Sequence, residues 1–377
     1  MTAGRPDAET SSAPRDALML REAPAAAARA APSQDVPLIA LCDASRRFVK
    51  TLDLAGRIGQ RLGARIREEV VHAVDRVDLA VAPGEVVGLV GESGCGKSTL
   101  GRLAVGLLPL TTGERMWKGQ RVDALAPGPA RTLQLKTQMI FQDPYASLNP
   151  RMRVVDIVGE APVTHRLIAP KQKVEYVGLM LNRVGLDPTL MRRYPHQFSG
   201  GQRARIGIAR ALAVKPEFLV CDESVAALDV SIQAQVLNLF MELRGALNLT
   251  YLFISHDLGV VQFIADRVVV MYLGRVVESA PAGELFARPN HPYTQALLAE
   301  VGRVEPRKRT FVPIKGEIPS PLDPPPGCHF HPRCPHAMAV CREVVPPLDT
   351  VAAGHRSACW LNHEPGARGA AINGALG

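Results

Sequence analysis

Short, continuous apolar runs alternate with longer segments of helical periodicity through the middle of the chain. Unbroken apolar runs are typical of strands buried on both faces of a parallel sheet. Such runs occupy residues 85–90, 218–221 and 250–255. Apolar residues spaced three or four apart, which predict helices, occur at residues 154–166, 173–184 and 231–247. Strands that alternate with helices predict an α/β fold with a mostly parallel sheet.

Weaker patterns complete the predicted core. Further strands are expected at residues 37–42, 77–81 and 137–141, and a closing hairpin at residues 268–271 and 275–278. The segment Val49–Val71 is polar, Arg-rich and interrupted by glycines, so we expect an exposed insertion there.

Composition changes at both ends of the chain. Residues 1–36 mix Ala, Pro, Ser, Arg and acids without an apolar core, which indicates a disordered tail and no signal peptide. Residues 302–327 are rich in proline and cannot form one continuous helix. We therefore predict a core domain at residues 37–301, followed at 302–377 by a linker and a small Cys-rich extension.

The overall composition is that of a soluble globular protein, with 47% hydrophobic and 21% charged residues in a chain of 377. No apolar run is long enough to cross a bilayer. The formal net charge is +8, but the basic residues are scattered, and the one short block is Arg307-Lys308-Arg309. We therefore expect no nucleic-acid partner, while contact with anionic lipid headgroups stays open.

A glycine-rich segment follows the first buried run and opens a helical one. Its residues are Gly91, Glu92, Ser93, Gly94, Cys95, Gly96, Lys97, Ser98 and Thr99. Strand, glycine turn and helix are the context of a phosphate-binding loop, in which backbone N–H groups and the helix N-terminus surround an anion. Lys97 is then expected to reach the β- and γ-phosphates of a nucleotide, and Ser98 to hold Mg²⁺.

Acidic and polar residues follow three other predicted strands. Asp222 and Glu223 end the run at 218–221, where ligands of parallel sheets gather. Asp222 suits a Mg²⁺ contact, and Glu223 suits a general base that polarises the attacking water. Gln142 follows the strand at 137–141 and can bind Mg²⁺ through its carbonyl. His256 follows the strand at 250–255 and can hydrogen-bond a γ-phosphate oxygen.

A second anion-binding helix end is predicted at Ser199, Gly200, Gly201 and Gln202, which open a helix that runs to Ala213. One phosphate loop already covers a triphosphate from one side. The second anion site therefore has a natural use in capping a nucleotide held by another subunit.

Taken together, this set resembles the nucleotide-binding subunits of ABC transporters over roughly residues 37–301. The matching segments are Gly91–Thr99 as Walker A, Gln142 as the Q-loop, Ser199–Gln202 as the signature motif, Phe218–Asp222 as Walker B, Glu223 as the catalytic glutamate, Asp229 as the D-loop aspartate and His256 as the switch histidine. Phe48 resembles the aromatic residue that stacks on adenine. The resemblance implies a P-loop ATPase core with RecA-like and helical subdomains, in which two such subunits enclose two ATP molecules. The sequence departs from the family pattern at Ser224–Ala226. This departure puts in question the geometry of the D-loop contact between the two subunits, and it does not involve the acidic residues Asp222 and Glu223.

The resemblance narrows towards the C-terminus. His291–Thr294, Gly316–Pro321 and Gly327–Pro335 are similar to the C-terminal extension of oligopeptide and dipeptide importer ATPases, with nickel importers as close relatives. A P-loop kinase or GTPase has no reason to carry the Ser-Gly-Gly-Gln segment. A soluble ABC ATPase of repair or translation usually brings coiled coils, inserted domains or a second ATPase half, which this chain lacks. A binding-only subunit disagrees with the presence of both Glu223 and His256.

Four cysteines lie near the C-terminus with the spacing C-x5-C-x6-C-x17-C. They are Cys328, Cys334, Cys341 and Cys359. Four thiolates can hold zinc or an iron–sulfur cluster, although structural zinc more often uses tight C-x2-C pairs. The wide spacing resembles the cluster-bearing extension of some peptide importer ATPases and implies [4Fe–4S]. Zinc and unliganded buried thiols are the alternatives.

The sequence thus predicts an ATPase that uses ATP and Mg²⁺ to energise a bacterial peptide-type ABC importer. Its expected partners are a second ABC ATPase subunit, identical or paralogous, two integral membrane permease subunits and, indirectly, an extracytoplasmic solute-binding protein. Its expected place is the cytoplasmic face of the inner membrane, as a peripheral subunit.

Overall fold

The computed structural model describes residues 36–50, 69–300 and 316–363. The predicted tail, apart from Val36, and most of the predicted insertion after Val49 therefore lie outside the described residues, as does the basic block at 307–309.

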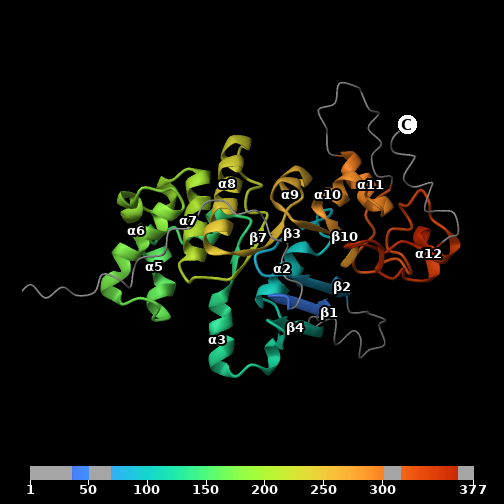
Figure 1. Ribbon diagram of the computed structural model, residues 1–377, viewed down its shortest axis with the longest axis horizontal. Coiled ribbons are helices and arrows are strands. Elements are labelled where there is room, and N and C mark those ends of the chain that lie inside the picture. Colours follow the sequence, from blue (N-terminus) through green and yellow to red (C-terminus); the bar gives the residue numbers. More distant parts are fainter. Residues whose placement is uncertain (1–35, 51–68, 301–315, 364–377) are drawn as a thin grey trace, which may run out of the picture. The chain divides into compact units, whose positions relative to one another are not determined.

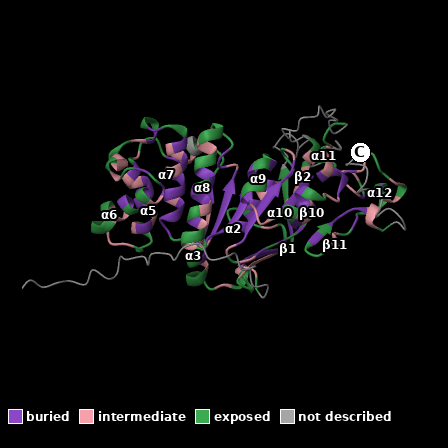
Figure 2. Ribbon diagram, turned by 45° about the horizontal axis from the view of Figure 1, so that its top comes forward, coloured by how far each residue is buried: buried purple, intermediate pink, exposed green. Residues whose placement is uncertain are grey.

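An eight-stranded sheet with the order β11-β12-β10-β9-β3-β8-β7-β6 organises the core. Five neighbouring strands pair in parallel, as the alternation of strands and helices predicts. They are β6 (Thr137–Ile140), β7 (Phe218–Asp222), β8 (Thr250–Ile254), β3 (Val86–Val90) and β9 (Arg267–Tyr272). Every residue of β3, β7 and β8 is buried, which explains their unbroken apolar sequences (Figure 2).

Antiparallel strands extend one side of this sheet. Strand β10 (Arg275–Pro281) returns from β9 through Leu273 and Gly274, which have φ of 41° and 80°. Two C-terminal strands then continue the sheet, β12 (His355–Ser357) beside β10 and β11 (Asp349–Ala352) at the edge. The predicted extension therefore contributes strands to the same sheet as the core.

A second, antiparallel sheet has the order β2-β1-β4-β5. Its strands are β2 (Glu69–Val81), β1 (Ile39–Lys50), β4 (Thr112–Trp117) and β5 (Gln120–Arg121). The register pairs Val49 with Val70 and Lys50 with Glu69. The segment predicted as an exposed insertion therefore begins and ends in paired strand residues, of which Val49 is 49% exposed, and residues 51–68 between them lie outside the described residues.

Helices connect the strands, and the predicted ones are present within one or two residues (Figure 1). The α-helices of the described residues are α2 (Lys97–Val105), α3 (Pro127–Lys136), α4 (Pro144–Ser147), α5 (Val154–Thr164), α6 (Lys173–Arg183), α7 (Gly200–Leu212), α8 (Val230–Leu247), α9 (Leu258–Ile264), α10 (Ala282–Ala287), α11 (Pro292–Glu300) and α12 (Ala339–Glu343). Helices α5, α6 and α7 pack on one another, and their buried apolar side chains join those of α8 and the strands β7 and β8 in one core cluster.

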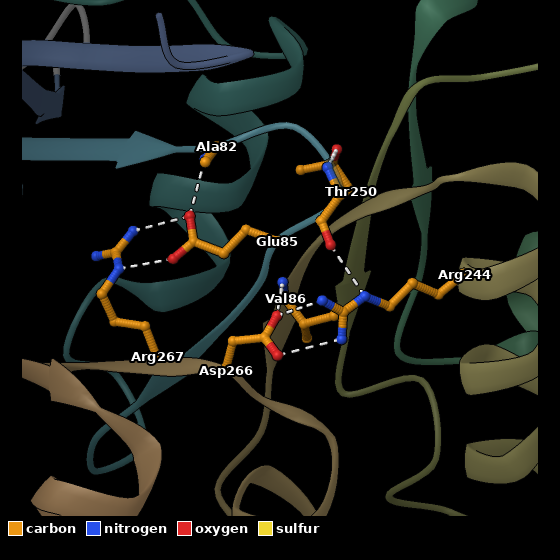
Figure 3. Close-up of polar contacts among 8 residues, drawn as sticks. Ala82, Glu85, Val86, Arg244, Thr250, Asp266 and Arg267 are labelled. Carbon is orange, nitrogen blue, oxygen red and sulfur yellow. Dashed lines mark hydrogen bonds and ion pairs between the residues drawn. The ribbon is translucent and has the colours of Figure 1, made fainter. Parts of the chain in front are cut away.

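Two ion pairs fix the ends of the parallel strands that lie away from the phosphate loop (Figure 3). Arg267 donates to Oε1 of Glu85 at 2.8 Å, and Arg244 donates to Oδ2 of Asp266 at 2.5 Å. Asp266 also accepts a bond of 2.9 Å from the backbone N–H of Val86, the first residue of β3. These contacts tie β3, β9 and α8 together and so set the start of the strand that delivers the phosphate loop.

Candidate functional site

The glycine-rich loop lies between β3 and α2, as its sequence predicts. Gly96 has a φ of 108°, and a Cβ there would lie 2.1 Å from the backbone oxygen of Ala73. The loop thus needs glycine both for the backbone angle and for its close approach to β2. Helix α2 begins directly after it, at Lys97, so the N–H groups of its first turn face the loop.

The ammonium group of Lys97 is buried within this loop. Its Nζ donates to the backbone oxygens of Gly91 at 2.8 Å and Glu92 at 2.9 Å. The residue is only 5% exposed. A buried lysine needs such acceptors, and these two hold the charge at the mouth of a phosphate-binding turn.

Ser98 and Asp222 meet across the gap between α2 and β7. The Ser98 hydroxyl donates to Oδ1 of Asp222 at 2.8 Å. Asp222 is 2% exposed, and burial raises the pKa of its carboxyl group. A buried carboxylate beside a hydroxyl is an oxygen donor set that suits Mg²⁺, which would also relieve the burial of the negative charge. The residues present therefore fit the ion predicted from the sequence.

Glu223 is held by two residues that the sequence placed at the ends of neighbouring strands. Gln142 donates from Nε2 to Glu223 Oε2 at 2.6 Å, and Nδ1 of His256 lies 3.4 Å from Oε1. Glu223 has a φ of 46°, a left-handed conformation that is uncommon outside glycine. Such strain is typical of residues whose position serves a function.

Four of these residues, Lys97, Ser98, Gln142 and Glu223, line an open pocket of about 380 Å³, whereas Asp222 and His256 do not. Its lining residues are Phe48, Val71, Ala73, Ser93, Gly94, Gly96, Lys97, Ser98, Thr99, Gln142, Glu223 and Pro321. Phe48 is 38% exposed, and the Arg46 guanidinium lies 4.8 Å from the centre of its ring. Gly91, Glu92 and Cys95 are not among the lining residues. Cys95 is buried, which raises the pKa of its thiol.

The second predicted anion site forms the N-terminus of α7. Ser199 is the N-cap, and its hydroxyl accepts a bond from the N–H of Gln202 at 3.3 Å, while the Gln202 side chain accepts from the N–H of Ser199 at 3.0 Å. In the described part of the chain, none of residues 199–202 lines the pocket around Lys97. Asp229 caps α8 in the same way, and its bonds to Ile232 and Ser231 lower the pKa of its carboxyl group.

The described residues do not support the metal centre that the spacing of the C-terminal cysteines suggested. Burial raises the pKa values of Cys328, Cys334 and Cys359, the last two to about 11 and about 12, and nearby thiols of the same set add to this effect. Across residues 36–50, 69–300 and 316–363, no three His, Cys, Asp or Glu side chains are placed to hold a metal ion. The predicted cluster and the zinc alternative are therefore not supported. Cys341 and Cys359 are buried, Cys328 and Cys334 are partly buried, and none of these four cysteines forms a disulfide.

Comparison with known sequences places this site in a family. Residues 74–226 match the ABC transporter family, and residues 277–341 match the C-terminal region of oligopeptide/dipeptide transporters. The oligopeptide transport ATP-binding protein AppF of Bacillus subtilis is 51% identical over 295 residues, which cover 77% of this chain and 90% of the relative. The chain belongs to the ATP-binding subunits of ABC transporters.

Other relatives agree with this family. A peptide import ATP-binding protein of Brucella abortus is 48% identical over 327 residues, covering 85% of this chain and 95% of the relative. Among solved structures, cbiO1 from Clostridium perfringens, part of an ABC transporter complex, matches with a TM-score of 0.55 at 25% identity, over 67% of this chain and 92% of that one. The dimeric cassette MJ0796 bound to ADP and Pi matches with a TM-score of 0.54 at 23% identity, over 65% of this chain and 98% of the other, and shows the shared fold.

This ABC subunit is an ATP hydrolase, as predicted. None of its described helices has the length and apolar character needed to span a membrane. Sequence reasoning missed Val71, Ala73 and Pro321 as lining residues of the nucleotide pocket. It also missed Tyr293, whose hydroxyl accepts a bond of 2.8 Å from the Glu92 N–H. The one signal for Tyr293 and Pro321 was that both lie in segments similar to the peptide-importer extension.

Proposed function

We propose that this ATPase energises a bacterial importer of oligopeptides or dipeptides. The observation that carries the proposal is the contact of Gln142 and His256 with Glu223, because Gln142 and Glu223 line the pocket of the phosphate loop. A catalytic set of this kind accompanies a C-terminal region of the oligopeptide/dipeptide type and relatives named for peptide transport. The same role in a nickel or other solute importer of the family is the alternative.

In this proposal, the pocket holds ATP with its base beside Phe48 and its phosphates in the loop. Lys97 would exchange its bonds to the Gly91 and Glu92 carbonyls for phosphate oxygens, so its charge is already in place before the nucleotide arrives. Thr99 and the N–H groups of the first α2 turn would complete the phosphate contacts.

Mg²⁺, when bound, would offset the negative charge of the phosphates. Ser98 would bind it directly, with Asp222 and the Gln142 carbonyl contributing oxygens directly or through water. Glu223 would orient the attacking water and accept its proton, and His256 would hydrogen-bond the γ-phosphate. Gln142 and His256 each lie against one carboxylate oxygen of Glu223, and the remaining lone pairs of these oxygens would accept the proton of the water.

Turnover is proposed to need two ATPase subunits. Ser199, Gly200, Gly201 and Gln202 lie on α7, away from the pocket that they would have to cap within the same chain. Each signature helix would instead cap the γ-phosphate held by the partner, with Asp229 near the junction. The partner is an identical or a paralogous chain.

The proposed complex contains two membrane permeases and draws solute from an extracytoplasmic binding protein. The subunit would act at the cytoplasmic face of the inner membrane. The loop after Gln142 would form the contact with a permease subunit. Within it, we propose a nucleotide-binding domain at residues 37–301, with helices α5–α7 as its helical subdomain, and an extension at 302–377.

Uptake measurements test the proposal. In a strain that lacks this gene, uptake of a radiolabelled tripeptide should fall to background, return with the wild-type chain and stay absent with Lys97→Ala. Unchanged peptide uptake together with lost ⁶³Ni²⁺ uptake would establish the alternative. If both uptakes persist in the deletion strain, the importer role is wrong.

A further inference from the structure

The C-terminal segment reaches back to the phosphate loop through one ion pair. Arg333 donates from Nη1 to Glu92 Oε2 at 2.7 Å and from Nη2 to Oε1 at 2.9 Å. The Arg333 side chain is 5% exposed and that of Glu92 is 19% exposed. A fork of two parallel bonds between guanidinium and carboxylate fixes direction as well as distance. Glu92 is therefore held in one orientation by a residue 241 positions away.

A cluster of buried rings holds Arg333 in place. Its guanidinium lies 5.9 Å from the centre of the Tyr272 ring and donates to the Tyr272 hydroxyl at 3.4 Å. Phe330, 2% exposed and three residues earlier in the same segment, packs against Tyr272 at 5.3 Å and Tyr293 at 5.4 Å between ring centres. These contacts give the arginine a rigid base on the core sheet.

Glu92 is bound at three separate groups. Its N–H donates to the Tyr293 hydroxyl at 2.8 Å, its carbonyl accepts from Lys97 at 2.9 Å, and its carboxylate receives the fork from Arg333. The residue thus links the turn of the phosphate loop to helix α11 and to the C-terminal segment. If Lys97 exchanges its bond to the Glu92 carbonyl for a phosphate oxygen, the contacts of Tyr293 and Arg333 with Glu92 remain and keep this turn in place.

Charge makes the contact relevant to binding. Glu92 is the only acid in the loop Gly91–Thr99. An unpaired carboxylate there would repel the triphosphate that the loop binds, and the partly buried setting weakens solvent screening. A guanidinium stays protonated at every pH the protein experiences, so it cancels this charge permanently.

We propose that Arg333 is a positioning residue for ATP binding, which acts by cancelling the charge of Glu92 and by fixing the start of the phosphate loop. Pro321, from the same C-terminal segment, lines the nucleotide pocket and accepts a bond of 3.2 Å from the His72 N–H. The segment therefore takes part in the nucleotide site at two places. The proposal concerns ATP binding by this chain and stands whichever solute is imported.

Four variants of the full chain test the proposal. They are Arg333→Met, Glu92→Gln, the double variant Glu92→Gln/Arg333→Met, and Arg342→Met as a control at an exposed arginine of α12. The affinity for Mg-ATP is measured by displacement of trinitrophenyl-ATP, and the Tm is measured without nucleotide. Arg333→Met should bind ATP about tenfold more weakly, because a charged hydrogen-bonded partner is lost. The double variant should return to within about threefold of wild type, because no unpaired carboxylate remains, and the control should be unchanged.

Recovery of ATP affinity in the double variant distinguishes a role of Arg333 in ATP binding from a role in stability alone. If Arg333→Met lowers the Tm but binds ATP like wild type, or if the double variant binds as weakly as Arg333→Met, the proposal is wrong. Should Arg333→Met fail to fold, Arg333→Lys replaces it, since this variant keeps the charge and loses the fork. It should bind about threefold more weakly, and an unchanged affinity would overturn the proposal.

Discussion

The Nε2 group of Gln142 donates a 2.6 Å hydrogen bond to Oε2 of Glu223 across the nucleotide pocket. His256 lies on the other oxygen at 3.4 Å. Three strand ends, those of β6, β7 and β8, therefore meet at one carboxylate. This contact couples the residue proposed as the base to the loop proposed to receive a permease, so the state of the membrane partner can reach the chemistry through one side chain.

The first prediction concerns this carboxylate. Glu223→Gln should leave the affinity for Mg-ATP within about threefold of wild type. Glu223 lines the pocket, but its proposed partner is the attacking water, and the phosphates are bound by other residues. The steady-state ATPase rate should fall at least about 100-fold, because the general base is lost. Size-exclusion chromatography with ATP should show an accumulated dimer. Glu242→Gln, at an exposed position of α8, is the matched control and should hydrolyse like wild type. A wild-type rate for Glu223→Gln would refute the assignment.

The second prediction concerns the signature helix. Ser199→Arg places a bulky cation at the exposed N-cap of α7. Turnover should fall about 100-fold or more, since removal of one anion-stabilising group has effects of this size. Equilibrium binding of ATP to the isolated variant chain should survive, because the change lies outside its own pocket. Equal loss of binding and turnover in the same chain would contradict the cross-chain role.

The third prediction follows from the burial of Asp222, which raises the pKa of its carboxyl group. The carboxyl group therefore binds its proton more tightly in the folded state than in the unfolded state. As a result, the free energy of unfolding decreases as the pH rises through the folded pKa. Without nucleotide and Mg²⁺, Asp222→Asn should therefore melt at a higher temperature than wild type at pH 8. The difference should shrink as the pH falls towards the ordinary carboxyl pKa of about 4, although the variant is inactive.

Thermal melts between about pH 4 and pH 8 check this sign. Asp323→Asn, at an exposed position, is the control and should melt like wild type throughout. If Asp222→Asn is less stable than wild type at pH 8 and the gap closes at low pH, the carboxylate is stabilised by its surroundings, and the account of this site is wrong.

The fourth prediction concerns the ion pairs at the far ends of the strands. Arg244→Met leaves Asp266 without its charged partner and also removes the 2.9 Å bond from Nε to the Gly84 oxygen. Because both side chains are mostly buried, unfolding should become easier by about 2–4 kcal/mol. Arg288→Met breaks an exposed pair with Glu284 and should cost no more than about 0.5 kcal/mol. Urea titrations of both variants give the comparison, and equal losses would contradict it.

Much of the fold could be predicted because its determinants are local. The apolar runs of β3, β7 and β8 reflect burial on both faces, and the Leu273-Gly274 turn marks its hairpin. Strands β4 and β5 gave no such signal, since their residues are exposed or half-buried. Strand β12 pairs with β10 near Glu278, almost 80 residues earlier, and a pairing over that separation leaves no local pattern.

The residues of the candidate site likewise fall into those that could be predicted from local sequence and those that could not. Lys97, Asp222 and Glu223 could be found because each follows or ends a recognisable strand. Arg333 and Pro321 could not, because their relevance depends on where a distant segment folds back. The cysteine spacing suggested a metal centre, yet spacing along the chain does not determine how thiols are oriented in space. The predicted domain boundary after residue 301 has no test here and stays a prediction.

The most direct test of the account is a structure of Glu223→Gln with bound Mg-ATP, determined by cryo-electron microscopy in complex with its partner ATPase and permeases. The account predicts a closed pair in which the γ-phosphate held by Lys97 lies within hydrogen-bond distance of the signature serine of the partner subunit. Ser199 of this chain should take the equivalent place on the partner's nucleotide. A closed complex in which the signature serines lie far from both γ-phosphates would contradict the central claim that two subunits share each ATP.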